Sequence, residues 1–284
     1  MKNILYQICF LLLIYAASGN CQSESSEEKR STILESDGYA FLAEDKTISE
    51  LRDLALLNAK RNALADAQTF IKSIVTTDNY KLISDIIASG AEGSVTILEK
   101  IDNGITSDNR YHIWIKAEVT YSLNQPDFEI PGVKSKTLPD ASSPLTVNIR
   151  TEYEKYKSGD KVIIFIEGNK QYYAKIVYID SKGDILQLLP NRNRKDNCFD
   201  GRKTFQIPDA NDNFELEVSP PFGKEKVIVY ASTEPLGEGD IEKFGNINLV
   251  KSGLDEYGMK TRGIKIKNKP AEFYEASCIL TTEP

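Results

Sequence analysis

Residues 48–75 read ISELRDLALLNAKRNALADAQTFIKSIV and predict one long helix. Apolar and small residues recur there at steps of three or four, which places them on one helical stripe. The members of the stripe are Ile48, Leu51, Ala55, Ala59, Ala63, Ala67, Phe70 and Ile74. Thr47 and Glu50 have the spacing of a capping box at its start. Because so many of these side chains are alanines, we expect the helix to approach a neighbouring sheet closely.

Strands are predicted on both sides of this helix. Residues 38–43 form a short strand candidate before it, and residues 94–101 become extended after Gly90. Residues 110–122 alternate strictly, which places one set of apolar side chains on a single face. That set is Tyr111, Ile113, Ile115, Ala117 and Val119. Residues 37–123 therefore predict an α+β domain, in which the long helix covers one face of a small antiparallel sheet.

The order of elements in this domain has a counterpart in known families. The helix has the form Leu51-x-x-x-Ala55-x-x-x-Ala59-x-x-x-Ala63, and Gly93 with two strands follows it. In this respect residues 37–123 resemble the flagellar assembly protein T N-terminal-like and lipoprotein-20-type domains. The resemblance implies a secreted or outer-membrane-associated bacterial protein without a common catalytic site.

The start of the chain predicts export. Lys2 is followed by an apolar run at 8–15 and by small residues at 16–19, which is the order of a secretory signal peptide. Two products of cleavage are open. Ordinary signal peptidase would leave Asn20 first, whereas the segment before Cys21 resembles a relaxed bacterial lipobox, in which Cys21 is lipidated. Either product is expected in the periplasm or at the outer membrane, and membrane attachment is expected only through this lipid.

The rest of the chain divides at changes in composition. Residues 22–36 are rich in Ser and Glu, which is typical of a flexible spacer, and residues 124–144 contain four prolines. Short strands separated by Gly, Pro and Asp turns then follow to the end, which predicts a β-sandwich. The predicted segments are a signal peptide (1–21), a spacer (22–36), the α+β domain (37–123), a linker (124–144) and the β-sandwich (145–284).

Several spaced anchors in the second domain also have a counterpart. They are Tyr153 to Tyr156 with Gly159-Asp160, Tyr173, Tyr178, Leu188-Leu189-Pro190-Asn191, Ile207-Pro208, Pro221-x-Gly223 and Ile228 to Ala231. With these anchors, residues 145–232 resemble the bacterial domain-of-unknown-function family 4384. The resemblance implies a module of envelope proteins, or one appended to kinases or peptidases, and assigns no activity to the module itself.

The composition argues against most catalytic sites. The chain has one histidine, His112, which alternation places opposite the buried face of its strand, and no nucleophile elbow lies near it. Zinc sites need more Cys and His than this chain has. The sequence predicts no catalytic, cofactor-binding or metal-binding residues, and hence no enzyme. The 42 acidic residues leave a carboxylate-dependent hydrolase open as an alternative, although Asp160 and Asp184 have the positions of turn residues.

Cys198 and Cys278 would remain as an even pair if Cys21 carries lipid. Disulfides persist in the oxidising compartment that export implies. We expect either a bond between these two cysteines or two separate core thiols, and of these two we predict the bond.

One basic cluster stands out in a chain of net charge −7, which has no overall attraction for nucleic acid. It consists of Arg192, Arg194, Lys195, Arg202 and Lys203. It would bind an acidic partner, a lipid head group or a glycan phosphate, or else be an ordinary solvated loop. Residues 209–220 resemble a calcium loop, but Phe214 and Pro220 occupy places that an EF-hand gives to Gly and Glu.

The function that follows is binding. The sequence predicts a non-enzymatic envelope-associated accessory or assembly protein, whose sandwich recognises another component of the cell envelope, either a protein or a glycan. One alternative is a glycan or small-ligand binding module that uses the basic loop. The other is the carboxylate-dependent hydrolase.

Overall fold

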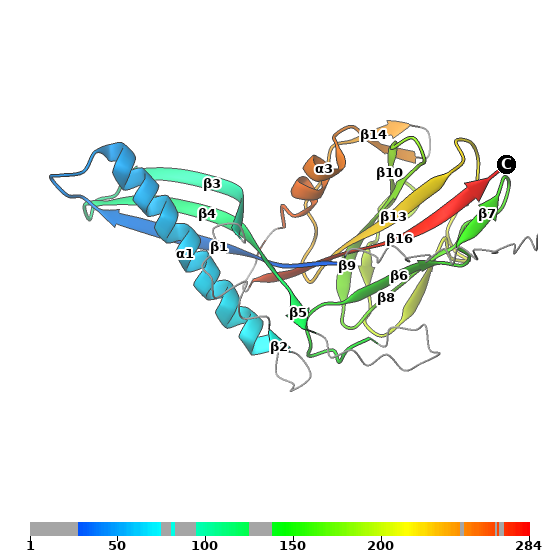
Figure 1. Ribbon diagram of the computed structural model, residues 1–284, viewed down its shortest axis with the longest axis horizontal. Helices are drawn as coiled ribbons and strands as arrows, with labels where there is room; N and C mark the ends of the chain where they lie inside the picture. Colours follow the sequence, from blue (N-terminus) through cyan, green and yellow to red (C-terminus); the bar gives the residue numbers. More distant parts are fainter. Residues whose placement is uncertain are drawn as a thin grey trace, which may run out of the picture.

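One long sheet runs through the molecule in the computed structural model, which describes residues 28–74, 81–82, 95–124, 138–244, 247–264, 266 and 270–284 (Figure 1). Eleven described strands form it, in the order β14-β15-β10-β9-β13-β16-β1-β4-β3, with β11 paired to β9 and β7 to β16. Their bounds are β1 (Lys29–Phe41), β3 (Val95–Ile105), β4 (Arg110–Tyr121), β7 (Lys155–Lys157), β9 (Tyr172–Ile179), β10 (Ile185–Leu189), β11 (Cys198–Phe199), β13 (Lys224–Ser232), β14 (Ile241–Phe244), β15 (Ile247–Val250) and β16 (Ala271–Glu283).

Two smaller sheets and two helices complete the described elements. A three-stranded sheet has the order β12-β8-β6, and β2 pairs with β5. Their bounds are β2 (Lys81–Leu82), β5 (Leu123–Asn124), β6 (Val147–Thr151), β8 (Ile164–Gly168) and β12 (Thr204–Ile207). The helices are α1 (Ile48–Ile74) and α3 (Leu254–Thr261).

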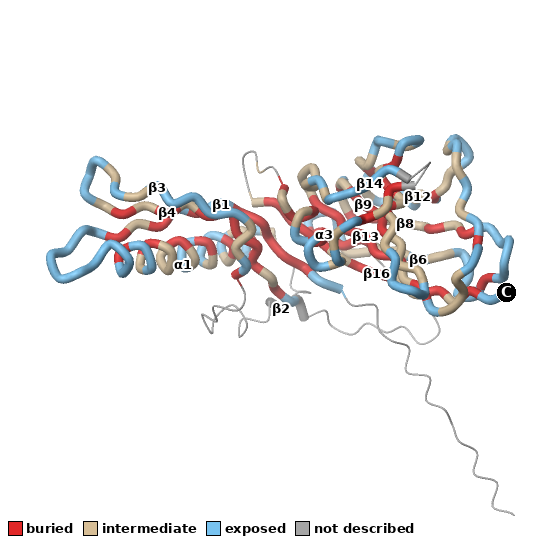
Figure 2. Tube along the Cα trace, turned by 90° about the horizontal axis from the view of Figure 1, so that it is seen from above, coloured by how far each residue is buried: buried red, intermediate tan, exposed pale blue. Residues whose placement is uncertain are grey.

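Helix α1 lies along one face of β1, β3 and β4, and its buried side faces these strands (Figure 2). Its buried residues are Leu51, Ala55, Ala59, Ala63, Ala67 and Ile71. The predicted stripe is therefore confirmed from Leu51 to Ala67 and wrong at its ends, because Ile48 is half exposed and Ile71 is buried in place of Phe70. The buried row keeps steps of four residues. Such a row is inclined to the helix axis, so α1 crosses the strands obliquely.

The predicted capping box at the start of α1 is confirmed. The backbone N–H of Thr47 donates to Glu50 Oε2 at 2.7 Å, and the backbone N–H of Glu50 donates to Thr47 Oγ1 at 3.3 Å. The hydrogen bonds from Thr47 hold the pKa of the Glu50 carboxyl below its ordinary value. The two side chains thus satisfy backbone donors that the first turn of a helix leaves without partners.

Helix α1 meets β1 at Gly38. A Cβ at this position would lie 2.0 Å from the carbonyl oxygen of Ala55 and 2.3 Å from the backbone nitrogen of Ala59. Strand β1 pairs with β16 only as far as Ile33, so its next residues form a sheet edge on that side. There the amides of Asn58 and Asn62 donate to the carbonyls of Tyr39 and Asp37, both at 2.8 Å. Gly38 and the alanines of α1 therefore bring the helix close enough to β1 for side chains of the helix to hydrogen-bond the backbone of the strand.

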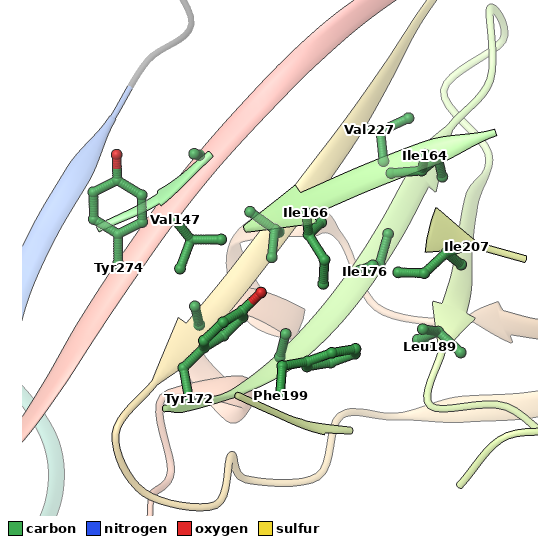
Figure 3. Close-up of a cluster of buried hydrophobic side chains, with 14 of the residues drawn as sticks. Val147, Ile164, Ile166, Tyr172, Ile176, Leu189, Phe199, Ile207, Val227 and Tyr274 are labelled. Carbon is green, nitrogen blue, oxygen red and sulfur yellow. The ribbon is translucent and has the colours of Figure 1, made fainter. Parts of the chain in front are cut away.

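The second half of the chain is a β-sandwich. The sheet β12-β8-β6 packs over β9, β13 and β16 of the long sheet, and one large apolar core lies between them. Figure 3 shows Ile164 and Ile166 of β8 in this core with Ile176 of β9 and Val227 of β13. The predicted fold class, an α+β unit followed by a β-sandwich, is confirmed.

The opposite face of the long sheet carries a separate core. Alternation along β13 sends Val227 and Val229 into the sandwich and Ile228 and Tyr230 to the other side. There they meet Tyr257 of α3, whose hydroxyl donates to Gln187 Oε1 at 2.5 Å. In Figure 1, α3 lies above the middle of the long sheet and the β6-β8 sheet lies below it, whereas α1 runs across β3, β4 and β1.

Strand β1 corrects the predicted spacer. Residues 29–36, assigned to the flexible spacer 22–36, form the first eight residues of β1, and residues 22–27 lie outside the described residues. Lys29 to Ile33 pair with β16 on one side, and Arg30 to Phe41 pair with β4 on the other. The prediction is wrong because Ser31 and Thr32 are completely buried although they are polar. The division into two separate folding units stays a prediction, since β1 belongs to both.

A buried ion cluster lies beside this shared strand. Arg262, which follows α3, donates from Nε to Glu118 Oε1 of β4 at 2.9 Å and from Nη2 to Glu275 Oε2 of β16 at 2.7 Å. Ser31 Oγ of β1 donates to the same Glu118 oxygen at 2.7 Å. Burial raises the pKa of Glu275, while the Arg262 charge opposes that rise. The cluster thus connects four elements from both halves of the chain.

The end of the predicted linker is also held against the sandwich by hydrogen bonds. Residues 125–137 lie outside the described residues, but the loop before β6 is bound by Asn169, which is fully buried. The Asn169 amide donates to the carbonyls of Asp140, Ser143 and Pro144 and accepts from the backbone N–H of Thr146. The last residues of the linker 124–144 are therefore part of the sandwich.

We expect Gly38→Ala to lower the free energy of unfolding by at least about 2 kcal/mol, because the added methyl would force α1 away from β1. Urea unfolding followed by circular dichroism measures this. Gly253→Ala is the matched control, since a Cβ there meets open space and its φ of −60° suits any residue. Equal effects of the two substitutions would contradict the packing described at Gly38.

Arg262→Met should lower the free energy of unfolding by about 3 kcal/mol, because it removes the guanidinium from the buried Glu118 and the partly buried Glu275 and leaves Glu118 only the more distant Lys29, at 3.8 Å. Adding Glu118→Gln to this variant should recover part of the loss. The comparison is Lys161→Met, which removes an exposed ion pair with Glu215 and should leave the urea midpoint unchanged. A midpoint for Arg262→Met equal to that of the control would show that the cluster does not stabilise the fold.

Candidate binding surface

The face of the first sheet that α1 does not cover carries a row of aromatic side chains. Residues of β1 and β4 that point toward α1 are buried against it, so their neighbours in sequence point to the opposite face. On that face the register places Asp37 opposite Trp114, Tyr39 opposite His112, and Phe41 opposite Arg110. We call these side chains the open face, together with their neighbour on β3; they are Asp37, Tyr39, Phe41, Ile101, Arg110, His112 and Trp114.

The open face is in contact with solvent at both of its ends. Phe41 is 75% exposed and Ile101, which lies opposite Trp114, is 52% exposed. Between them Tyr39, His112 and Trp114 are half-buried. Large apolar side chains as exposed as Phe41 and Ile101 on a shared face are typical of a surface that meets another molecule.

A network of contacts fixes the rings of the open face. The rings of Tyr39 and His112 stack, with centroids 4.4 Å apart and planes 9° apart, and the Arg110 guanidinium lies 4.1 Å from the Tyr39 centroid. The Asn103 amide lies 3.2 Å from His112 Nδ1, and His112 Nε2 lies 2.6 Å from Asp37 Oδ1. If Asn103 donates to Nδ1, then Nε2 carries the proton and donates to Asp37. The aromatic surface is thus preorganised.

These contacts also bear on catalysis. Both ring nitrogens of His112 are engaged, one by Asp37 and the other by Asn103. A general base needs a ring nitrogen within reach of the proton that it removes. The predicted orientation of His112, opposite the buried face of β4, is confirmed. Its side chain is nevertheless only 16% exposed, because Tyr39 and Asp37 pack against it.

The charges that β4 places on this side are all paired within the chain. Arg110 Nε donates to Asp108 at 2.7 Å, and this bond holds the pKa of Asp108 below its ordinary value. Lys116 pairs with Glu99 at 2.9 Å, and His112 and Glu118 have the partners already described. The open face therefore carries no net positive charge, and with the tautomer given above the Asp37 carboxylate makes it net negative.

The predicted basic loop is not assembled into one cationic surface. Arg194 Nη1 lies 3.0 Å from Asp212 and 3.4 Å from Asp209, and its guanidinium lies over Phe199. Arg202 pairs with Asp140 at 3.2 Å, and Lys203 pairs with Asp200 at 2.6 Å. Only Arg192 and Lys195 are exposed without an ion pair to a described residue. A binding role for this loop stays a prediction.

Acidic residues singled out in the sequence have structural roles. Asp212 accepts from the backbone N–H of Asp209 at 2.8 Å as well as from Arg194, which closes the turn that resembled a calcium loop. Asp160 accepts from the backbone N–H of Lys157 at 2.6 Å, and the backbone N–H of Asp184 donates to Asp180. Among the described residues, no group of three or more His, Cys, Asp or Glu is placed to hold a metal ion.

The predicted disulfide between Cys198 and Cys278 is wrong, because both residues are free thiols. Strand register gives the reason. Cys198 pairs with Tyr173 of β9, whereas Cys278 pairs with Val227, which in turn pairs with Tyr178 of β9. Five residues along β9 correspond to about 16 Å, and a disulfide requires Cα atoms within about 7 Å. Cys21, the predicted lipidation site, lies outside the described residues.

One buried lysine is unusual. Lys175 of β9 is 5% exposed, donates from Nζ to the carbonyl oxygen of Gly237 at 2.6 Å and lies near the ring of Tyr257. Burial lowers its pKa to about 8. Perturbed lysines occur at functional sites, but here the amine is covered by the 237 loop and α3. We therefore assign it to the packing of that loop.

Comparison with known proteins supports one of the two resemblances. Residues 155–235 match the model of the family described as a domain of unknown function (DUF4384), which spans β7 to β13. This segment is similar to that family. The resemblance proposed for residues 37–123 stays a prediction. No curated protein and no solved structure matches the chain.

The open face is not among the predicted sites, although the sequence contains a signal for it. Tyr39 and Phe41 alternate on one strand, and Arg110, His112 and Trp114 alternate on the other. Alternation of this kind places aromatic residues on the face opposite a buried one.

In the described part of the chain, no helix combines the length and hydropathy that a membrane span requires.

Lys175 predicts a specific dependence of stability on pH. Its pKa of about 8 in the folded chain is below about 10.4, the value in an unfolded chain. The unfolded state therefore binds more protons between these two pH values, and the free energy of unfolding should rise with pH there, by up to about 3 kcal/mol. Urea unfolding at about pH 7.5 and about pH 9.5 measures the rise, and Lys175→Met should lack it. The same slope in both proteins would contradict the assignment.

Proposed function

We propose that this protein is an exported, non-enzymatic, envelope-associated accessory protein that binds another component of the cell envelope through the open face. The single observation that carries the proposal is that face itself. The rings of Tyr39 and His112 are held in place by Asp37, Asn103 and Arg110 instead of being packed into a core, while Phe41 and Ile101 remain exposed. A preorganised surface of this kind loses little entropy when it binds.

The location of the surface differs from the one the sequence favoured. The sandwich was expected to provide recognition, but three of the five cations in its basic loop are neutralised locally. The open face belongs to the first unit and lies on the side of the long sheet that α1 leaves uncovered. In this proposal the sandwich supports the first sheet through β16 and the Arg262 cluster.

Two further considerations support binding over catalysis. The only histidine of the chain has both ring nitrogens occupied. Among the described residues, three pairs of carboxylates each share one cation: Asp209 and Asp212 share Arg194, Glu118 and Glu275 share Arg262, and Asp240 and Glu256 share Lys260. A carboxylate-dependent hydrolase would need a pair of acids that share a substrate.

The test uses the full chain in a Cys21→Ser background, so that a lipid cannot hold the protein at the membrane. We expect the exported chain to sediment with envelope fragments. Adding Phe41→Asp and Ile101→Asp should release it into the soluble fraction, because a charge on the open face opposes the contact. Tyr153→Asp is the control, since Tyr153 is 59% exposed on the other half of the molecule.

Two results would contradict the proposal. One is that the Cys21→Ser chain is soluble and without a cross-linked partner although its open face is intact. The other is that the uncleaved chain stays in the cytoplasm.

A further inference from the structure

We infer that the ligand of the open face is an uncharged glycan, a short run of neutral sugar rings lying along β1 and β4. The inference rests on the proposed function and names the chemical class of the envelope component. It is carried by three properties of the surface: its rings, its polar groups and its charge.

The rings supply the apolar part of such a site. Sugar rings present faces of C–H groups, and these pack against aromatic side chains. Phe41 and Trp114 lie at opposite ends of the open face, four residues apart along the register and on neighbouring strands. Neither ring stacks with another described aromatic ring. The stacked rings of Tyr39 and His112 lie between them. Because these two rings are already held against each other, they form a rigid surface, which we call the aromatic floor.

Polar atoms lie at the edge of this floor. Asp37 uses Oδ1 for His112, and its side chain is 50% exposed. Asn103 uses its amide nitrogen for His112, and the residue is exposed in the irregular part of β3 between Asp102 and Gly104. No hydrogen bond from a described residue reaches Asp37 Oδ2 or Asn103 Oδ1, so both oxygens can accept from hydroxyl groups. The same two residues that hold the aromatic floor would orient a polyhydroxylated ligand on it.

Charge selects among glycans. Arg110 is paired with Asp108, Lys116 with Glu99 and His112 with Asp37, so the described residues of the open face offer no free cation. A polymer rich in phosphate or carboxylate would find no counter-charge and would lose part of its hydration on binding. An uncharged sugar chain needs no such partner. The sequence associated glycan binding with the basic loop, and the inference moves it to a surface without net positive charge.

The size of the surface also favours a short chain over a folded partner. The open face extends over four residue steps of β1 and across three strands, which with side chains is on the order of 20 Å by 15 Å, or about 300 Å². A stable protein–protein interface buries about 800 Å² on each partner. A few sugar rings would cover the open face completely.

The chain supplies its own probe, because Trp114 is its only tryptophan. The full chain is titrated with three uncharged tetrasaccharides (the tetramer of N-acetylglucosamine, cellotetraose and maltotetraose) and with tetragalacturonate as a charged comparison. We expect at least one uncharged tetramer to shift the Trp114 emission in a saturable way. Because no ion pair is formed, raising NaCl from about 50 to about 500 mM should leave the affinity unchanged.

Variants then locate the site. Phe41→Ala should weaken binding by about threefold to tenfold, the range expected for loss of one aromatic contact. Tyr153→Ala removes another exposed aromatic ring from the other half of the molecule and should have no effect. Both positions are solvent-exposed, so neither variant should lose its fold.

Three results would overturn the inference: no response to any uncharged tetramer, equal binding by wild type and Phe41→Ala, or binding of tetragalacturonate alone that disappears with salt. If the titration fails while the Phe41→Asp and Ile101→Asp chain is still released from envelopes, the open face binds a component of another class. If both assays fail, the proposed function falls as well.

Discussion

The pairing of β1 with β16 is the constraint on which the rest of the structure depends. Five residues of β1 pair with β16, and the remainder of the same strand continues along β4. Because strand alternation is preserved along β1, this single pairing fixes which faces of the two halves coincide. Helix α1 and the sheet β12-β8-β6 lie on one face of the long sheet, and α3 lies on the other. The side on which the open face lies follows from this, since it is the face that α1 leaves free.

Local patterns in the sequence were enough to predict α1 and β4 of the first unit and parts of β1 and β3. The four-residue steps of alanine predict α1, Thr47 and Glu50 predict its start, and alternation in residues 110–122 predicts the buried face of β4. These features depend on neighbours within a few residues, so a local reading finds them. The ends of the helical stripe were missed, because the choice between Phe70 and Ile71 depends on the angle at which the helix crosses the sheet.

Contacts between distant residues account for what the sequence did not predict. The start of β1 was assigned to a spacer because Arg30, Ser31 and Thr32 are polar, yet all three are buried, and the side chains of Arg30 and Ser31 bond the remote residues Leu145 and Glu118. The disulfide prediction failed because the number of cysteines says nothing about strand register, and the register keeps Cys198 and Cys278 apart. The aromatic alternation of the open face was visible, but the bonds from His112 to Asp37 and Asn103 depend on how β1, β3 and β4 are arranged.

The most direct measurement of the central claim is hydrogen exchange of the full chain, read at the backbone amides of residues 30–33 in β1 and 271–275 in β16. If the two halves share one sheet, these amides should exchange as slowly as those in the centre of β4, because opening them requires the same cooperative unfolding. Fast exchange of both segments, with β4 and β9 still protected, would show that the halves are separate domains and would contradict the account.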